Sequence, residues 1–425
     1  MSAAVAAYRV VVGLGAGTVS GVDVFSATIV RRLNALGVPA HVVLSTPHSK
    51  WYPMPVPGDV VRHQLDLDRD EPWGNRWRAM IRYLEGQSPC IYIPNYDYDY
   101  SCVSPKLSSG VCIVGIIHSD DPVHYDHVAR LGRFWDTVVA VSGEIADKTL
   151  ALDPSLADRL VTIPYGIPLP SALPPRTTDH GGLLKVVYAG RLDQPQKRVL
   201  DLPPIFERLR AMHVPAELTI IGDGPNGPEL RQSLESLLVR GSVRLRGTLP
   251  NPAVLEAFEK SDVVILTSAF EGLPICLLEA MSRGCVPVVT DVRSGIPDLV
   301  VDGVNGFRVP VGDSAAFADR LARLQGDPAL RAALSARAAR TVLEGGYGAD
   351  LMVERYVAVF EQALDRSRRR VYRRPRGPIL YPRTLLDVTW KDRLPPRVRS
   401  AAGRAKRLLG AALSAGRLRS ARVDP

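Results

Sequence analysis

The chain has 425 residues, of which 46% are hydrophobic and 23% are charged, and its formal net charge is +9. These values are ordinary for a globular protein and exclude the disordered and fibrous classes. The length allows two domains, each with its own hydrophobic core, together with additional segments.

The first part of the sequence predicts parallel strands joined by helices. Apolar runs rich in β-branched residues predict strands, and amphipathic segments lie between or after them. The expected strands are 9–14, 40–44, 91–93, 111–117 and 138–141, and the expected helices include 22–36 and 143–152. A stretch rich in proline and glycine at 163–182 then predicts an interdomain linker. We therefore expect an N-terminal Rossmann-like domain over residues 1–170.

A second series of the same kind follows the linker and predicts a second doubly wound domain over residues 183–346. Its expected strands are 184–189, 216–221, 243–246, 263–266 and 286–289, and its expected helices are 205–212, 228–239, 252–260 and 274–283. Helical segments follow at 314–343 and 349–366, and we expect the segment 347–366 to pack back on the N-terminal domain. Open parallel sheets bind ligands at the carboxyl ends of their strands, so two facing sheets would form a cleft.

The residues from 367 to 425 form a basic tail. Residues 366–425 contain 18 Lys or Arg and three acidic residues, whereas the preceding 365 residues carry a net charge of −6. A cationic tail suggests contact with an anionic surface. The segment 398–422 mixes basic residues with leucines, as a basic amphipathic helix on a membrane does, and a disordered solvated tail is the alternative. It has no interleaved aromatic residues for base stacking, so we expect no nucleic acid partner.

Cysteine usage and the lack of long apolar runs favour the cytoplasm. The five cysteines form no Cys-x-x-Cys pair, which favours reduced thiols. Residues 1–14 lack a positively charged leader, and apolar runs such as 111–117 are too short to cross a bilayer. We expect no signal peptide and no integral membrane segment, and a peripheral position at the inner face of the membrane where the tail binds lipid.

A glycine-rich loop follows the first predicted strand. It reads GLGAGT at 13–18, and Ser20 and Gly21 precede the next helix. Helix-end N–H groups favour the approach of phosphate or sugar. A dinucleotide fingerprint would require glycine where Thr18 stands and an acid after the second strand, and both are missing. A purely structural turn is the alternative.

His118 ends the strand 111–117 and is expected to point into the cleft. There it would hydrogen bond to a sugar or orient an acceptor, and a structural histidine is the alternative. The imidazole and carboxylate groups near it are also plausible metal ligands. The members of that cluster are His118, Asp120, Asp121, His124, Asp126 and His127. We nevertheless expect no metal.

Two cations come just after the first strand of the second series. Arg191 can bind two phosphate oxygens, and Lys197 supplies a mobile point charge. Such cations stabilise the negative charge that grows on a departing diphosphate. Solvated surface cations are the alternative. The turn from Gly222 to Pro225, after the next strand, is a weaker indication of ligand contact.

The stretch 268–281 reads SAFEGLPICLLEAM and follows the strand 263–266. Gly272 allows a ligand to approach the backbone closely, and Pro274 suits the first position of a helix. The free N–H groups at 273–276 therefore predict an anion site suited to a diphosphate.

Two glutamates of this stretch could hold different parts of one ligand. Glu279 lies among apolar residues of the predicted helix, and a carboxylate there requires a hydroxyl or cationic partner. Glu271 lies in the preceding loop, eight positions earlier. Two hydroxyl-bearing groups of one ligand would satisfy both carboxylates, and two unrelated structural acids are the alternative.

The segment EGLPICLLE followed by AMSRGCVPVVT resembles the retaining GT-B glycosyltransferases of family 4, whose signature is a pair of glutamates separated by seven residues. The resemblance extends through AGRL at 189–192 with Lys197, IGDGP at 221–225, GIPD at 295–298 and DGVNGF at 302–307. Two residues depart from the family pattern. Arg198 stands where Gly is more usual, and Asp298 stands where Glu is more usual.

The resemblance implies the GT-B fold, in which two doubly wound Rossmann-like domains face each other across a cleft. It implies that Glu271 contacts hydroxyls of the donor sugar, that Glu279 contacts the ribose, and that Gly21 faces the donor phosphates. The expected catalytic residues are His118, Arg191, Lys197 and Glu271. The expected donor-binding residues are Gly21, Gly190, Gly222, Gly224, Gly272, Leu273, Pro274, Ile275 and Glu279.

The resemblance also implies the reaction, which is transfer of a sugar from a nucleoside diphosphate donor, UDP- or GDP-linked, to a hydroxyl of a glycan, a lipid or a small molecule. The configuration would be retained by a same-face substitution, without a metal or another cofactor. Asp97-Tyr98-Asp99 imitates the metal motif of a different glycosyltransferase fold, but lies in a tyrosine-rich segment expected to shape an acceptor pocket or to pack. The alternatives are a nucleotide-sugar epimerase on the same fold and a noncatalytic sugar- or lipid-binding module.

Overall fold

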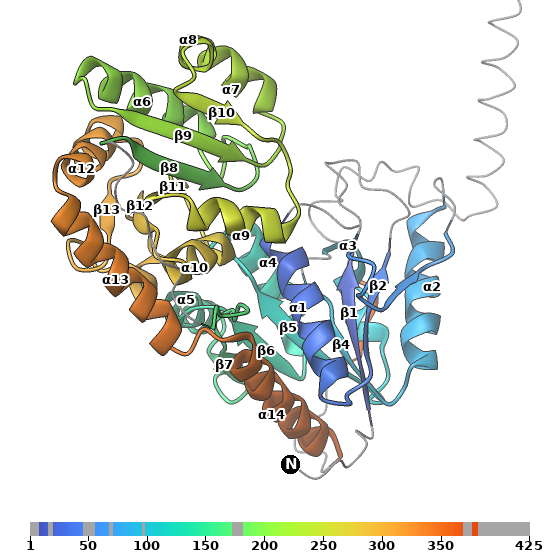
Figure 1. Cartoon of the computed structure of the whole chain (residues 1–425). Helices are drawn as coiled ribbons and strands as arrows, with labels where there is room; N and C mark the ends of the chain where they lie inside the picture. The colour runs from blue at the N-terminus through green and yellow to red at the C-terminus, as the bar shows by residue number, and fades with distance from the viewer. Residues whose placement is uncertain are drawn as a thin grey trace, which may run out of the picture.

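The computed structural model describes residues 8–15, 20–45, 56–67, 71–95, 98–171, 182–368 and 376–380. Within these residues the chain forms two α/β units, one after the other in sequence (Figure 1). Asp97 and all of the basic tail except 367–368 and 376–380 lie outside the described residues.

The N-terminal unit is built on a parallel sheet with the order β3-β2-β1-β4-β5-β6-β7. Its strands are β1 (Arg9–Leu14), β2 (Ala40–Leu44), β3 (Arg62–Gln64), β4 (Cys90–Ile93), β5 (Val111–Ile117), β6 (Thr137–Ala140) and β7 (Leu160–Thr162). Every residue of β4, β5 and β6 is buried, as in a parallel sheet covered on both faces. The edge strands β3 and β7 have three residues each, too few for an apolar pattern to predict them.

Helices connect these strands and cover the sheet. They are α1 (Gly21–Ala35), α2 (Trp73–Gly86), α3 (Tyr98–Ser101), α4 (Pro122–Leu131) and α5 (Gly143–Leu152), with short 3-10 turns at Ser104–Lys106, Gly132–Phe134 and Pro154–Leu156. Helix α1 begins at Gly21, one residue before the predicted start, because the Ser20 side chain caps it by accepting a hydrogen bond from the Asp23 amide. Residue Gly21 therefore lies in the first turn, at the carboxyl edge of the sheet.

The second unit has a parallel sheet with the order β10-β9-β8-β11-β12-β13. Its strands are β8 (Leu184–Ala189), β9 (Ala216–Ile221), β10 (Val243–Leu245), β11 (Val263–Leu266), β12 (Val286–Thr290) and β13 (Phe307–Val309). In both units the chain runs outward from a central strand in one direction and then crosses to the other side. This reversal is the switch point beside which doubly wound sheets bind ligands.

Two segments of the second unit that were expected as single helices are each divided in the structure. The helices of the unit are α6 (Leu202–Ala211), α7 (Gly227–Ser233), α8 (Glu235–Val239), α9 (Asn251–Glu259), α10 (Ile275–Ser282), α11 (Ile296–Leu299), α12 (Ser314–Gly326) and α13 (Pro328–Glu344), with a 3-10 turn at Val199–Asp201. The single helix expected at 228–239 is divided at Leu234. The segment expected at 314–343 is divided at Asp327, whose carboxylate caps α13 by accepting from the Leu330 amide at 2.9 Å.

The chain returns to the first unit through its last described helix. Helix α14 (Ala349–Arg368) packs against α1 and β5 of the N-terminal unit (Figure 1). On the way it crosses the segment that left that unit: the Ile167 amide donates to the Tyr347 carbonyl and the Ala349 amide donates to the Ile167 carbonyl, both at 2.9 Å. The outgoing and returning connections between the units therefore lie side by side.

Candidate functional site

The loop between β11 and α10 touches the N-terminal unit through its backbone. Ser119 and Gly272 form an antiparallel bridge, and the Asp120 amide donates to the Glu271 carbonyl at 3.0 Å. A Cβ on Gly272 would lie 2.0 Å from the His118 carbonyl oxygen, so no other residue type fits there without movement. Glycine at this position thus permits the end of β5 to meet the loop that carries Glu271.

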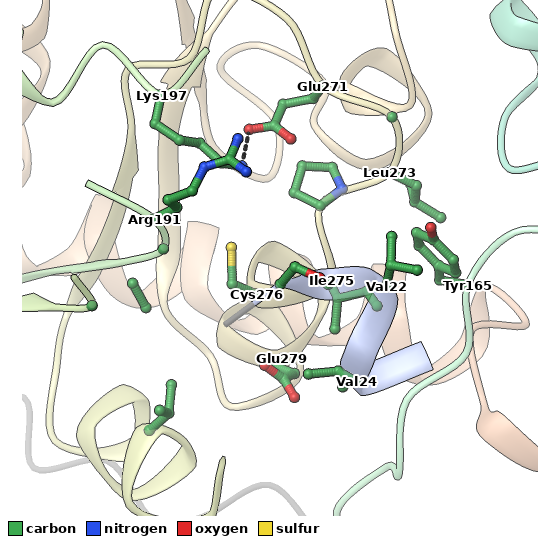
Figure 2. Close-up of a pocket in the computed structure, with 18 of the residues that line it drawn as sticks. Val22, Val24, Tyr165, Arg191, Lys197, Glu271, Leu273, Ile275, Cys276 and Glu279 are labelled. Atoms are coloured by element: carbon green, nitrogen blue, oxygen red, sulfur yellow. Dashed lines mark hydrogen bonds and ion pairs between the residues drawn. The ribbon is translucent and has the colours of Figure 1, made fainter. Parts of the chain in front are cut away.

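Glu271 and Lys197 form a buried ion pair. The Lys197 Nζ lies 2.6 Å from Glu271 Oε1, and the two side chains are 15% and 5% exposed (Figure 2). The Ser268 hydroxyl also donates to Glu271 Oε1 at 2.6 Å. Although burial opposes it, the Glu271 carboxylate raises the pKa of Lys197, so the ammonium stays charged.

The loop between Arg191 and Lys197 is held by Asp193. Its Oδ1 accepts from the amides of Gln196 and Lys197 at 2.9 and 3.0 Å, and its Oδ2 pairs with Arg191 Nε. Burial acts to raise the pKa of Asp193, but the Lys197 amide and the Arg191 charge prevail and lower it. One carboxylate therefore pairs with the side chain of Arg191 and anchors the backbone of Lys197. Sequence reasoning did not single it out.

Predicted glycines bring the ends of β8 and β9 close together. Gly222 has φ +135°, and a Cβ there would lie 1.9 Å from the Gly190 carbonyl oxygen. A Cβ on Gly224 would lie 2.3 Å from the Leu192 carbonyl oxygen. The backbone after β8 and β9 is thus packed closely, and Gly190 and Gly222 present no side chain to the cavity between the units.

Helix α10 presents its N-terminus to the cleft between the units. Pro274 is its N-cap rather than its first helical residue, which corrects the sequence prediction by one position. The side chain of Ile275 lies opposite Gly21 across the cleft, and a Cβ on Gly21 would lie 3.7 Å from Ile275 Cδ1. The amide groups at the starts of α1 and α10 therefore lie on opposite sides of one space.

Glu279 lies deeper in the same space and is 5% exposed. Burial raises its pKa above the ordinary value of a glutamate, while the hydrogen bond from Asn251 Nδ2, 2.8 Å from Oε1, and the Arg283 charge oppose this. Asn251 begins α9 just after the carboxyl end of β10, a position at which its polar side chain could have been predicted to face the cleft.

His118 is buried and neutral. Burial lowers its pKa to about 3. Its Nδ1 contacts the Tyr165 hydroxyl and its Nε2 lies 3.1 Å from Asn95 Oδ1. Both ring nitrogens therefore have protein partners, which the sequence did not predict.

These residues surround one cavity of about 300 Å³ between the two units (Figure 2). Of the predicted site residues, all but Gly224 line it: His118, Arg191, Lys197, Glu271, Gly21, Gly190, Gly222, Gly272, Leu273, Pro274, Ile275 and Glu279. Its walls also contain residues that the sequence analysis did not assign to the site, among them Ser20, Val22, Val24, Tyr165, Gln196, Thr248, Leu249, Asn251 and Val254. Most of these are apolar or lie in loops without a motif, so no sequence signal marked them.

The alternative metal cluster around His118 is not assembled. Among the described residues, no group of three His, Cys, Asp or Glu side chains lies in an arrangement that could hold a metal ion. Asp120 pairs with Lys148 at 2.6 Å, Asp121 caps α4, and His127 lies 2.6 Å from the Ser101 hydroxyl. These side chains thus point to different partners.

Comparison with known proteins identifies the second unit. Residues 184–327 match the family model described as Glycosyl transferases group 1. Over these residues the second domain is similar to this family. The match covers β8 to α12 and so includes the ion pair, the Asp193 loop and α10.

Curated relatives match only parts of their own length. The chain is 30% identical over 213 residues to an exopolysaccharide phosphotransferase of Streptomyces coelicolor, a match that covers 49% of this chain and 21% of the relative. It is 32% identical over 168 residues to the N-acetyl-alpha-D-glucosaminyl L-malate synthase of Bacillus anthracis, covering 40% and 43%. The chain thus spans between a fifth and half of the length of these relatives.

Solved structures show the arrangement of both units. Anabaena HepE in complex with UDP and glucose superposes with a TM-score of 0.65 at 16% identity, covering 84% of this chain and all of that one. At this identity the likeness shows the fold alone. The chain has the GT-B fold, with two Rossmann-like domains facing each other across a cleft, as the sequence predicted.

We expect Glu279→Gln to raise the melting temperature at about pH 7, and this gain to shrink as the pH falls towards about 4. Because burial raises the pKa of Glu279, the folded protein binds this proton more readily than the unfolded chain. The cost of the buried charge is therefore present at neutral pH and is lost as the pH falls through the raised pKa. Glutamine keeps the oxygen that accepts from Asn251 and carries no charge.

Thermal melting across this pH range measures the effect. The matched control is Glu354→Gln on the exposed face of α14, which should change the melting temperature little at any pH. A Glu279→Gln protein that melts below the wild type at neutral pH would contradict the assignment of a buried, costly charge.

Proposed function

We propose that this protein is a retaining, metal-independent glycosyltransferase that moves a sugar from a nucleoside diphosphate to an acceptor hydroxyl. One observation carries the proposal: the interdomain cavity holds a buried Lys197–Glu271 pair beside the N-terminus of α10 and opposite Gly21. Cations, free amides and a carboxylate in one apolar cleft are the groups that a nucleotide sugar needs.

The diphosphate would lie against α10. The amides of Ile275 and Cys276 begin the helix and point their positive end at the cleft. Lys197 uses one of its three N–H donors for Glu271, and Arg191 uses two of its five for Asp193 and Gln196. The remaining donors have no other partner among the described residues, and they would bind phosphate oxygens and stabilise the charge that develops as the glycosidic bond breaks.

The two glutamates would bind opposite ends of the donor. Glu271, held by Ser268 and Lys197, faces the end of β5 and would accept hydrogen bonds from hydroxyls of the sugar. Glu279 lies beside Asn251 and would accept from the ribose. The leaving phosphate would take the proton of the acceptor hydroxyl on the same face, which retains the anomeric configuration and requires no metal.

In this proposal the donor is a UDP- or GDP-linked sugar. The acceptor is a glycan, a lipid-linked sugar or a small molecule. The UDP and glucose in the HepE structure and the glucosaminyl group in the name of the Bacillus synthase support this class of ligand. The proposed location is the cytoplasm.

We expect Lys197→Ala and Glu271→Ala each to reduce turnover by about 10²–10³-fold, the loss that follows removal of one stabilising group from a transition state. Each change also leaves its partner as a buried, unpaired charge and should lower the melting temperature. The double variant removes both charges, so it should melt above either single variant and remain as inactive. Transfer assays with a panel of UDP- and GDP-sugars, chosen by thermal shift, provide the measurement.

The control is an exposed ion pair of the same type. Glu256 lies on α9 and pairs with Lys260, which follows the helix; the side chains of Lys260 and Glu256 are 70% and 60% exposed. Lys260→Ala and Glu256→Ala each break this pair and should leave turnover unchanged. Near-normal transfer by both site variants would refute the assignment. Conversion of the nucleotide sugar without an acceptor would favour an epimerase, and binding without any turnover would favour a noncatalytic module.

The stereochemistry and the metal requirement are tested on the same reaction. We expect proton NMR of the first product formed to show the anomeric configuration of the donor, because the substitution occurs on one face. We expect excess EDTA to leave the rate unchanged, because Lys197, Arg191 and the α10 amides neutralise the diphosphate. An inverted product or a rate lost on chelation would contradict the corresponding part of the proposal.

The basic tail is proposed to bind anionic lipid. In the described part of the chain no helix is long and apolar enough to cross a membrane. The 18 basic residues at 366–425 would instead attract an anionic surface. We expect the full chain to sediment with phosphatidylglycerol vesicles at low salt and a variant ending at residue 368 not to do so. Equal sedimentation of both would contradict a role for the tail.

A further inference from the structure

A buried asparagine at the end of β4 is fixed in one orientation by its neighbours. Asn95 Nδ2 donates to the Gly13 carbonyl at 3.2 Å and to the Ser26 hydroxyl at 2.9 Å. The Ser26 hydroxyl donates its own proton to the Val22 carbonyl at 2.7 Å, so it can accept from Asn95. Because a carbonyl oxygen only accepts, the amide nitrogen must face Gly13, and Oδ1 must face His118.

The orientation of Asn95 determines which nitrogen of His118 carries the proton. Asn95 Oδ1 lies 3.1 Å from His118 Nε2 and can only accept, so Nε2 is protonated. Burial lowers the pKa of His118 to about 3, so the ring is neutral and Nδ1 bears a lone pair. The contact between Nδ1 and Tyr165 is therefore a hydrogen bond donated by the Tyr165 hydroxyl.

Tyr165 lies at the wall of the interdomain cavity. Its ring packs against His118 and Phe25, and Figure 2 shows it at the edge of the pocket beside Leu273 and Val22. Burial raises the pKa of Tyr165, so the phenol keeps its proton. Since that proton is given to His118, the oxygen has only lone pairs left for a ligand.

We propose that Asn95 and His118 are positioning residues that orient the Tyr165 hydroxyl, and that the Tyr165 oxygen accepts a hydrogen bond from a hydroxyl of the transferred sugar. Tyr165 and His118 line the cavity where Ser119 meets Gly272, next to Glu271 and beyond the phosphate-binding amides of α10. A sugar attached to the diphosphate would reach this wall. The proposal rests on the proposed glycosyltransferase function and assigns His118 an indirect role in it.

The surroundings keep this chain of hydrogen bonds uncharged. The other titratable groups near the ring are His124 on α4 and Tyr356 on α14, which packs on Phe25 beside Tyr165. Burial lowers the pKa of His124 and raises the pKa of Tyr356, so both are neutral at physiological pH. The carboxylate of Glu271 is turned to Lys197 and Ser268.

Nitrogen NMR of the histidine-labelled full chain tests the first step. The protein has eight histidines, and His118→Gln identifies the signals of His118 by their loss. We expect the pattern of a neutral ring protonated on Nε2, unchanged between about pH 5.5 and 8. A ring protonated on Nδ1, or one that titrates with an ordinary histidine pKa, would overturn the proposal.

A charged partner should change this behaviour. In Asn95→Asp a carboxylate faces Nε2 and favours the imidazolium. We expect the pKa of His118 to rise and its signals to titrate within the measured range. A folded Asn95→Asp protein with His118 signals like those of the wild type would show that Asn95 does not control the ring.

The second step is tested by removing one hydroxyl. We expect Tyr165→Phe to raise KM for the nucleotide sugar by about 3–10-fold, the loss of one neutral hydrogen bond, while the affinity for the free nucleoside diphosphate stays unchanged. Tyr356→Phe is the matched control, because that buried hydroxyl has no hydrogen-bond partner in the described part of the chain, and should leave both values unchanged.

The outcomes separate this proposal from the function on which it rests. A wild-type KM in Tyr165→Phe, or an equal loss of affinity for the free nucleoside diphosphate, would contradict the Tyr165 contact while leaving the glycosyltransferase intact. A wild-type protein that transfers no sugar from any nucleotide sugar would overturn both the proposed function and the Tyr165 contact with the sugar. The NMR pattern would then test only whether Asn95, His118 and Tyr165 form the proposed hydrogen bonds.

Discussion

The site depends on one close backbone contact between the two domains. Gly272 meets the His118 carbonyl at a distance that leaves no room for a side chain, and Ser119 pairs with it as in a sheet. The position of the β11–α10 loop relative to β5 is therefore set by main-chain atoms. Glu271 directly precedes Gly272, and His118 directly precedes Ser119. The Ser119–Gly272 contact therefore also sets the distance between Glu271 and His118 in the wall of the cavity.

Two pairs of opposite charges form before any ligand binds. Glu271 faces Lys197 and Asp193 faces Arg191, whereas the carboxylate of Glu279 accepts from the neutral Asn251. Desolvating a single charge at such depth would be costly, and pairing reduces this cost. The same carboxylates hold the cations in fixed directions, which prepares them for a doubly charged ligand without further ordering.

The sequence predicted the parts of the fold that have a regular pattern. The central strands β1, β5, β8 and β11 are predicted because most of their residues are apolar and many are β-branched. The three-residue strands β3, β7 and β13 and the helix α2 are missed by the sequence analysis. Three residues are too few to show a hydrophobic period, and α2 begins at Trp73 without a side-chain cap.

In the candidate site, too, only the residues that belong to a recognisable pattern are predicted from the sequence. Arg191, Lys197, Glu271 and Glu279 occur at a recognisable spacing, and the structure brings them to one cavity. Asn95 and Tyr165 come from different strand ends and have no motif, and only the fold brings them to His118. Asp193 looked like an ordinary turn residue, since a sequence does not show which amides a carboxylate will accept from.

The paired crossing of the chain near Ile167 and Gly348 restricts how the molecule can open. A Cβ on Gly166 would lie 2.6 Å from the Gly348 carbonyl oxygen, so the two connections touch without intervening side chains. Two adjacent covalent connections that cross at one place favour rotation of the domains about that crossing, which would separate the Ser119–Gly272 bridge at the cavity. Substrate entry and product release would then be governed by torsions in these few residues, at a distance from the sugar, and variation there would alter the exchange rate without altering the chemistry.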